Sequence, residues 1–285
     1  MTTYLDQNAL IQLGRKARDP EFRKRLDAAI ASGSFRTVVS SWHLIETAHT
    51  TNVANAVELA EFIDSLNPLW LYERRNLQIM DVGDDFFRFL KIDHQPEPRL
   101  VTRSAVIAAI NGAKDGPGFD ISSRRMVEQW LRFPDQLKSV EAAFQKNIEA
   151  LLALRDATKA GKLTEAIRKQ ADELMVSMSI PARTPSGLEY GRDSKINYIA
   201  QFDPKKIPSI ALESAISEKE WGDEAVGKAD RNTFVDKIHL ISALPLVDEI
   251  VSDDKFFAAI YPFTVATGHV KAKLVAVSEC LKRFN

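Results

Sequence analysis

Four acidic side chains, widely separated along the chain, stand at positions from which an α/β fold could bring them together. Asp6 directly follows the short β-prone stretch Thr2–Leu5, and Asp254 follows a second such stretch. Glu46 and Asp236 lie in helical patterns beside apolar or aromatic neighbours instead of on a clearly charged face. A buried acid is costly unless it is paired or binds a metal, and carboxylate oxygens suit Mg²⁺ or Mn²⁺. The chemistry that these residues predict is therefore binding of a divalent metal ion.

Each of these acids also has an ordinary structural explanation. Asp6 could cap the helix that follows it, and Asp253 or Asp254 could cap the helix that follows them. Glu46 could be a plain helix acid, and Asp236 could form an ion pair with a nearby Lys or Arg. These alternatives stay open at the level of the sequence.

The elements that must position the acids alternate between strand and helix near the N-terminus. Thr2–Leu5 is predicted to be a strand at a buried edge of a sheet, and Phe35–Val39 a second strand. Four helices are predicted here. The first begins at Asn8, the second runs over 20–30, the third includes Trp42, Ile45 and His49, and the fourth runs over 55–66. The order β-α-α-β-α-α indicates a parallel sheet with crossover helices, and such sheets form ligand sites beyond the carboxyl ends of their strands.

The middle of the chain, from 73 to 225, has mostly helical periodicity. A long helix is predicted over 127–157, interrupted at Pro134, and another over 163–175. The stretch 180–208 is rich in proline and is expected to be irregular. After Arg231 the α/β pattern returns, with a predicted helix over 232–244, a strand over 249–252, a short helix over 255–260 and a terminal helix over 270–284.

The acids and the segments around them resemble, in order, the motifs of the PIN domain, a metal-dependent nuclease fold. The segment from Tyr4 to Leu10 is similar to its opening pattern of a strand, Asp, any residue, Asn or Ser, and an aliphatic residue. The segment from Val38 to Glu46 is similar to its second strand and acidic helix. The stretch from Asp236 to Asp254 is similar to the C-terminal half of the PIN domain, where an Asp-led helix is followed by a strand and a Thr-any-Asp step. Asp236 and Asp254 are 18 residues apart, and Ser252 stands where the family more usually has Thr.

This resemblance covers the two ends of the chain, roughly 1–70 and 230–285. It implies an α/β fold with a PIN-like three-layer α/β/α core and a central, mainly parallel sheet. The core would be discontinuous, formed by 1–72 and 228–285, and interrupted by a large, mostly α-helical insertion over 73–227. Such an insertion accounts for the 190 residues between Glu46 and Asp236, since the entropic cost of a longer connection grows slowly. It could cover, shape or block the cleft.

The resemblance further implies a nuclease, and an endoribonuclease before a deoxyribonuclease, whose products carry a 5′-phosphate and a 3′-hydroxyl. The expected catalytic residues, holding one or two Mg²⁺ or Mn²⁺ ions, are Asp6, Glu46, Asp236 and Asp254. Asp253 is an alternative ligand, although the spacing favours Asp254. Asn8 and Ser252 would orient the ligands or the phosphate. Basic side chains that could follow a nucleic-acid backbone, each also explained as a solvated surface residue, are Arg74, Arg75, Arg124, Arg125 and Arg192.

Composition limits the partners and the compartment. The 38 basic and 39 acidic residues give a net charge of -1, which provides no bulk attraction to nucleic acid or to anionic membranes. The single cysteine, Cys280, cannot form an internal disulfide, so a reducing compartment fits best. Neither a secretory signal nor a run of ~18 apolar residues is present. The chain is thus expected to be cytoplasmic, with RNA as its partner and with an inhibitor protein and a homodimer compatible with the family. A toxin-like role is a family-level expectation.

Two other function classes compete with the nuclease. One is a catalytically inactive PIN-like module that binds RNA or a partner protein through the insertion. The other is a phosphatase with an aspartyl nucleophile, but the second acid of its usual strand-Asp-any-Asp opening is Asn8 here. Nucleophile elbows, Walker-type phosphate loops and His-Glu-any-any-His zinc motifs do not occur. The five histidines show no ligand spacing; they are residues 43, 49, 94, 239 and 269.

Overall fold

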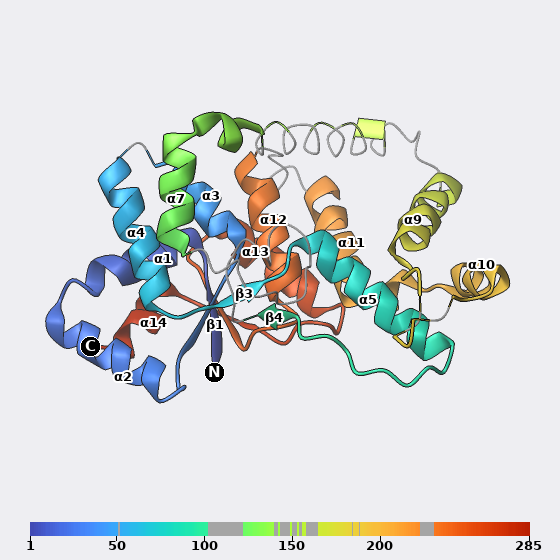
Figure 1. Ribbon diagram of the computed structural model, residues 1–285, viewed down its shortest axis with the longest axis horizontal. Coiled ribbons are helices and arrows are strands. Elements are labelled where there is room, and N and C mark those ends of the chain that lie inside the picture. The colour runs from blue at the N-terminus through green and yellow to red at the C-terminus, as the bar shows by residue number, and fades with distance from the viewer. Residues whose placement is uncertain are drawn as a thin grey trace.

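The fold is built on one twisted sheet near the centre of the molecule (Figure 1). The computed structural model describes residues 1–50, 52–101, 122–139, 165–183, 185–187, 189–222 and 231–285, together with 142, 149, 153, 156 and 157. Its six strands lie in the order β4-β3-β2-β1-β5-β6. They are β1 Thr2–Leu5, β2 Arg36–Val39, β3 Leu69–Leu71, β4 Leu100–Val101, β5 Glu249–Val251 and β6 Lys273–Val275. Every neighbouring pair is parallel except β3 and β4.

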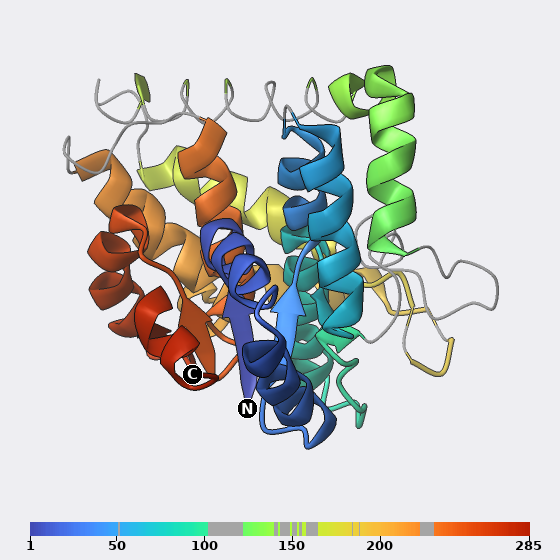
Figure 2. The same ribbon diagram turned by 90° about the vertical axis from the view of Figure 1, so that its left-hand side faces the viewer.

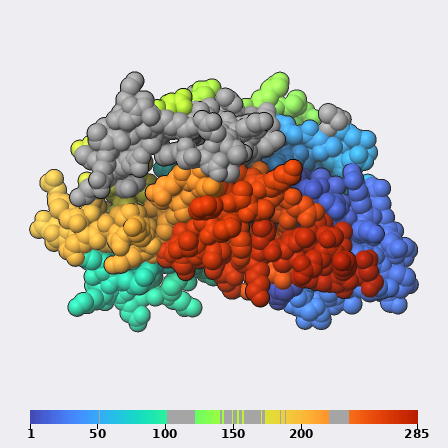
Figure 3. Space-filling model, turned by 180° about the vertical axis from the view of Figure 1, so that it is seen from behind, coloured from blue at the N-terminus to red at the C-terminus, as the bar shows by residue number. Residues whose placement is uncertain are grey.

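Strand β1 lies in the middle of the sheet, so its predicted place at an edge is wrong. Tyr4 is opposite Val38 of β2 on one side and opposite Ile250 of β5 on the other. The strand is short and comes first in the chain, but both of its backbone edges are paired by segments from distant parts of the sequence. The first and last parts of the chain consequently lie against each other, as the view from behind shows (Figure 3).

Helices cover both faces of the sheet, as the two ribbon views agree (Figures 1 and 2). Alternate strand residues point to opposite faces. Leu5, Val39 and Val251 belong to one apolar cluster, with helices α1, α2, α4, α7 and α14. Tyr4 and Val38 belong to the other, with α11, α12 and α13. The prediction of an α/β fold with a mainly parallel sheet is confirmed.

Helix bounds follow from local signals at their ends. Asp6 and Asp254 accept hydrogen bonds from the first-turn amides of α1 and α13, and Pro20 stands at the first position of α2. The helices that precede residue 100 are α1 Gln7–Lys16, α2 Pro20–Ala31, α3 Ser41–Ala48, α4 Val53–Ser65 and α5 Arg74–Phe89. The later ones are α7 Ser123–Arg132, α9 Glu165–Ser179, α10 Arg192–Gln201, the 3-10 helix η1 Pro204–Lys206, α11 Pro208–Gly222, α12 Arg231–Ala243, α13 Lys255–Val265 and α14 Val277–Lys282.

Two sequence predictions about these elements need correction, and a central strand was also missed. The terminal helix expected over 270–284 is strand β6 followed by the short helix α14, because Leu274 and Val275 pair with β5. Strand β3 was not predicted. The stretch 180–208, expected to be irregular, contains α10 and η1. The predicted interruption at Pro134 is confirmed: α7 ends at Arg132 and Phe133 leaves the helical conformation, since the residue before a proline disfavours it. Most of the long helix predicted beyond it lies outside the described residues.

The middle of the chain contacts the core and also has a core of its own. Its strand β4 pairs with β3, and Met126 and Val127 of α7 join the cluster beneath α4. Phe86 and Val176 belong to a separate cluster between α5, α9 and α10. The boundaries predicted at 72 and 228 stay a prediction.

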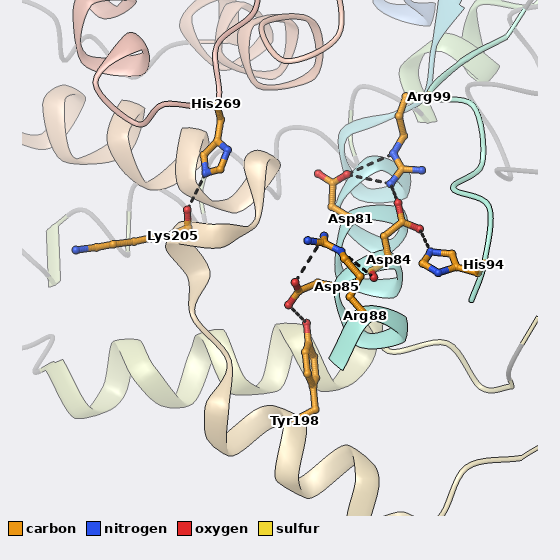
Figure 4. Close-up of polar contacts among 9 residues, drawn as sticks. All are labelled: Asp81, Asp84, Asp85, Arg88, His94, Arg99, Tyr198, Lys205 and His269. Atoms are coloured by element: carbon orange, nitrogen blue, oxygen red, sulfur yellow. Dashed lines mark hydrogen bonds and ion pairs between the residues drawn. The ribbon is translucent and has the colours of Figure 1, made fainter. Parts of the chain in front are cut away.

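Acidic side chains of α5 hold the connection that leads into β4 (Figure 4). Arg99 donates to Asp81, with a nitrogen–oxygen distance of 3.3 Å, and also to Asp84. His94 contacts the second oxygen of Asp84 at 3.0 Å. These contacts place the antiparallel strand at the edge of the sheet. No helix in the described ranges is long and apolar enough to cross a membrane.

Candidate metal and nuclease site

Asp6 stands at the carboxyl end of the central strand and has two roles there. Its side chain accepts a hydrogen bond of 2.6 Å from the Ala9 amide, so the predicted capping role is confirmed. Its own amide donates to the Val251 carbonyl of the neighbouring strand at 3.1 Å. The backbone on both sides of the carboxylate is therefore held by the sheet and by the first turn of α1.

Ser252 connects Asp6 to the next acidic segment. Its hydroxyl lies close enough to the Asp6 carboxylate to lower the pKa of that group, and it accepts from the Asp254 amide at 2.9 Å. Burial raises the pKa of Asp6, and the charges of Asp254 and then Asp253 raise it further, whereas the Ser252 and Ala9 hydrogen bonds lower it. The carboxylates of Asp253 and Asp254 thus lie close enough to Asp6 to raise its pKa, as expected where acids meet without a cation.

Asp254 and Asp253 point in different directions from this edge. Asp254 caps α13 by accepting from the Phe256 amide at 2.6 Å. Asp253 accepts from the Val277 amide at the start of α14 at 3.0 Å. Both residues are exposed, and of the two, Asp254 has the larger electrostatic effect on Asp6. Because a carboxylate has about four lone-pair sites, each can cap its helix and still accept another ligand.

Glu46 and Asp236 are brought to the same end of the sheet by contact between α3 and α12. The imidazole rings of His43 and His239 lie edge to face, 5.2 Å apart, and both contact Tyr4 of β1. Glu46 comes one turn after His43 in a helix that leaves the carboxyl edge, and Asp236 one turn before His239 in a helix that returns from it. Both acids are therefore placed one turn farther from the sheet than the histidine pair, and both are half-buried.

Apolar side chains next to these two acids strengthen the same contact. Trp42 and Ile45 of α3 pack with Val235 and Ile238 of α12 in a cluster that also contains Leu137. The apolar neighbours noticed in the sequence are thus the contact between the two helices. This packing explains why neither acid lies on an outer, fully solvated face.

His43 is a fully buried group that links two strand ends. Its Nε2 lies 2.7 Å from the Leu5 carbonyl oxygen, and the Ser40 amide donates to its Nδ1 at 2.9 Å. A carbonyl can only accept and an amide N–H can only donate, so Nε2 carries the proton and the ring is neutral. Burial lowers the pKa of His43 to about 4, and burial lowers that of His239 to about 3.

Gln7 makes a second link between the same two segments. Its Nε2 donates to Thr47 Oγ1 at 3.1 Å, and the Thr47 hydroxyl donates to the His43 carbonyl at 2.6 Å. Because the hydroxyl proton is already committed, Thr47 must accept from Gln7, which fixes the orientation of the amide. The Gln7 Oε1 atom is then buried and has no hydrogen-bond partner among the described residues.

The donors at this edge suit a hard cation in kind, although they are not assembled around one point. Within the described part of the chain, no three His, Cys, Asp or Glu side chains are grouped closely enough to hold a metal ion. The acids nevertheless offer only oxygen ligands, which suit a hard cation. Burial is the main cause of the raised pKa of Asp6, and the neighbouring acids add to it. The buried Gln7 Oε1 is a further unsatisfied oxygen.

The remaining predicted residues are distributed as follows. Asn8 is exposed in the first turn of α1. Arg74 forms an ion pair with Glu213, and Arg124 pairs with Glu61 and Glu128, so these two arginines already have acidic partners. The predicted basic side chains that are exposed and have no ion pair with a described residue are Arg75, Arg125 and Arg192.

Two groups with structural importance were not predicted from the sequence. The histidines were set aside because they lack ligand spacing, yet His43 and His239 each lie three residues from a predicted ligand. Gln7 follows Asp6 directly. The signal that could have found them is this proximity in sequence to the acids. Cys280 is buried in the apolar cluster beneath α1, and burial raises the pKa of its thiol to about 11.

Comparisons of the chain with protein-family models, with curated proteins and with solved structures found no match.

Proposed function

We propose that this chain is a divalent-metal-dependent nuclease, and specifically an endoribonuclease that hydrolyses phosphodiester bonds at the carboxyl edge of its sheet. The observation that supports it most is the proximity of Asp6 to Ser252 and Asp254, since Asp6 is 246 or more positions away from both of them in the chain. Glu46 and Asp236 flank the same edge on two helices in contact. The order of these four acids in the chain and their positions at this edge are those expected of a PIN-like core.

In this proposal the acids bind and the neighbouring polar groups orient them. Asp6, Glu46, Asp236 and Asp254 would hold Mg²⁺ or Mn²⁺, which would supply a Lewis acid that activates water and neutralises charge on the phosphate. The Ser252 hydroxyl, which lowers the pKa of Asp6 and accepts from the Asp254 amide, would help to orient the two acids. Since the acids are not grouped around one point, binding would have to draw the four side chains together. The exposed arginines would contact the polymer backbone.

The experiment that tests the nuclease is a cleavage assay on labelled single-stranded RNA and DNA with Mn²⁺, with Mg²⁺ and with EDTA. Cleavage of RNA is expected with either metal and none with EDTA, with 5′-phosphate ends on the products. The matched control is Asp6→Asn, because Asn caps a helix about as well as Asp but lacks the charge. Full metal-dependent cleavage by Asp6→Asn or by Asp236→Asn would contradict the proposal.

One observation favours the second candidate, a binding module without catalysis. Leu174 and Met178 of α9 and Ile196 of α10 are all more than half exposed, although they belong to helices that also have a buried apolar face. Exposed apolar side chains on neighbouring helices are a common feature of protein-binding surfaces. Titration calorimetry with Mn²⁺ separates the two candidates: the inactive module should bind the metal weakly, and Asp6→Asn should not change that binding.

A further inference from the structure

Two hydrogen bonds connect the residues on either side of Asp6 to residues on either side of Glu46. The first runs from His43 Nε2 to the carbonyl of Leu5, at 2.7 Å. The second runs from Gln7 Nε2 to Thr47 Oγ1, at 3.1 Å. Leu5 and Gln7 enclose Asp6 in the sequence.

His43 precedes Glu46 in α3 by three residues, and Thr47 follows it directly. They also bond to each other, because the Thr47 hydroxyl donates to the His43 carbonyl one turn earlier. The two connections therefore start from a single turn of helix and end on the residues directly before and directly after Asp6. We call this arrangement, formed by Leu5, Gln7, His43 and Thr47, the strand–helix clamp.

The members of the clamp are well placed to act as a rigid unit. His43 and Thr47 are fully buried, with exposed fractions of 0%. The tautomer of His43 is fixed by the Ser40 amide on its other nitrogen, and the amide orientation of Gln7 is fixed by the committed proton of Thr47. Each hydrogen bond has one possible direction, so the clamp holds one spacing between β1 and α3.

We propose that the strand–helix clamp sets the relative position of the Asp6 and Glu46 carboxylates, so that Gln7, His43 and Thr47 are positioning residues of the metal site. This inference rests on the proposed metal-dependent function. None of the three side chains needs to contact the metal or the phosphodiester. Groups that orient metal ligands in this way typically contribute about 10–100-fold to metal affinity.

The test uses Thr47→Val, which removes the hydroxyl from both of its hydrogen bonds but keeps the β-branched shape. Thr264→Val is the matched control, because Thr264 is equally buried and its hydroxyl bonds to the carbonyl of its own helix at 2.7 Å. Among the described residues, no side chain donates to the Thr264 hydroxyl as Gln7 donates to that of Thr47. Thr47→Ser restores the hydroxyl, and Gln7→Met removes the same bond from a less buried residue should Thr47→Val not fold.

Two measurements on the full chain are made with these variants. Hydrogen exchange of residues 2–13 is measured without metal, and Mn²⁺ affinity is measured by calorimetry. Thr47→Val and Gln7→Met are expected to raise exchange in the first turn of α1 about tenfold and to weaken Mn²⁺ binding by about tenfold or more. Thr47→Ser and Thr264→Val should stay within about threefold of the original chain, as expected for changes that leave the ligand orientation intact.

The possible failures have different meanings. Unchanged exchange in Thr47→Val and Gln7→Met would show that the clamp does not hold α1, and would overturn the inference. Faster exchange with unchanged Mn²⁺ affinity, while Asp6→Asn abolishes binding, would overturn the inference but leave the metal site standing. Absence of Mn²⁺ binding by the unaltered chain would overturn the proposed function, and the positioning role together with it.

Discussion

Asp254→Asn is expected to lower metal-dependent cleavage by about 100-fold or more while leaving the fold intact. Loss of a group that only supports a metal ligand lowers metal affinity or activity by about 10–100-fold. Loss of the ligand itself should therefore lower activity by about 100-fold or more. The fold should survive because Asp254 contributes to structure by accepting from the Phe256 amide, and Asn is an equally good cap. Steady-state cleavage rates and urea unfolding of the same preparation provide the two readouts.

Asp253→Asn is the matched control for this experiment. Its amide oxygen can still accept from Val277, and its position differs from Asp254 by one residue. We expect cleavage within about threefold of the original chain, since a residue outside the ligand set has at most an orienting effect. If Asp253→Asn lost activity and Asp254→Asn retained it, the ligand assignment would be reversed. If both retained it, Asp6 would lack the partner that the proposal requires.

The acids themselves could be recognised from the sequence because each belongs to a local pattern. Asp6 and Asp254 each follow a short apolar strand and precede a helix, which is visible within ten residues of chain. The capping reading is confirmed for both side chains, and the reading as metal ligands stays a prediction. Capping uses one carboxylate oxygen, so it does not exclude a second role.

The parts of the fold that sequence analysis missed depend on contacts between distant segments. Whether β1 lies at an edge or in the centre is decided by β5, which is more than 240 residues away. Strand β6 has three residues, too few to show a period of two, and the helix α14 that follows it makes the whole segment resemble one amphipathic helix. Local periodicity contains no information about either pairing.

The polar links of the site were missed for the same reason. His43 bonds to Leu5 across 38 residues and Gln7 to Thr47 across 40. Histidine is informative in a sequence when it has the spacing of a metal ligand, but here the ring is a buried, neutral bridge between backbone groups. Its contribution follows from the geometry of two strand ends, which no single stretch of sequence displays.

The buried histidine pair predicts that the free energy of unfolding falls by about 4 kcal/mol between about pH 7.5 and about pH 5. Burial holds the pKa of His43 at about 4 and that of His239 at about 3, below the ordinary value of 6.5. In this interval the unfolded chain binds protons at both residues and the folded chain does not, so stability falls as the pH falls. Each histidine contributes about 2 kcal/mol, since one pKa unit corresponds to about 1.4 kcal/mol.

Other groups change this total, and a single substitution isolates the histidines. The raised pKa values of Asp6 and Glu73 act in the opposite direction, because the folded chain then holds protons more readily at low pH. His239→Phe keeps an aromatic ring against Tyr4 but cannot titrate. Urea unfolding of both chains at the two pH values should show that this substitution removes about half of the loss. An equal loss in the two chains would mean that His239 becomes protonated without unfolding, and the α3–α12 contact would then have to be looser than the 5.2 Å ring separation indicates.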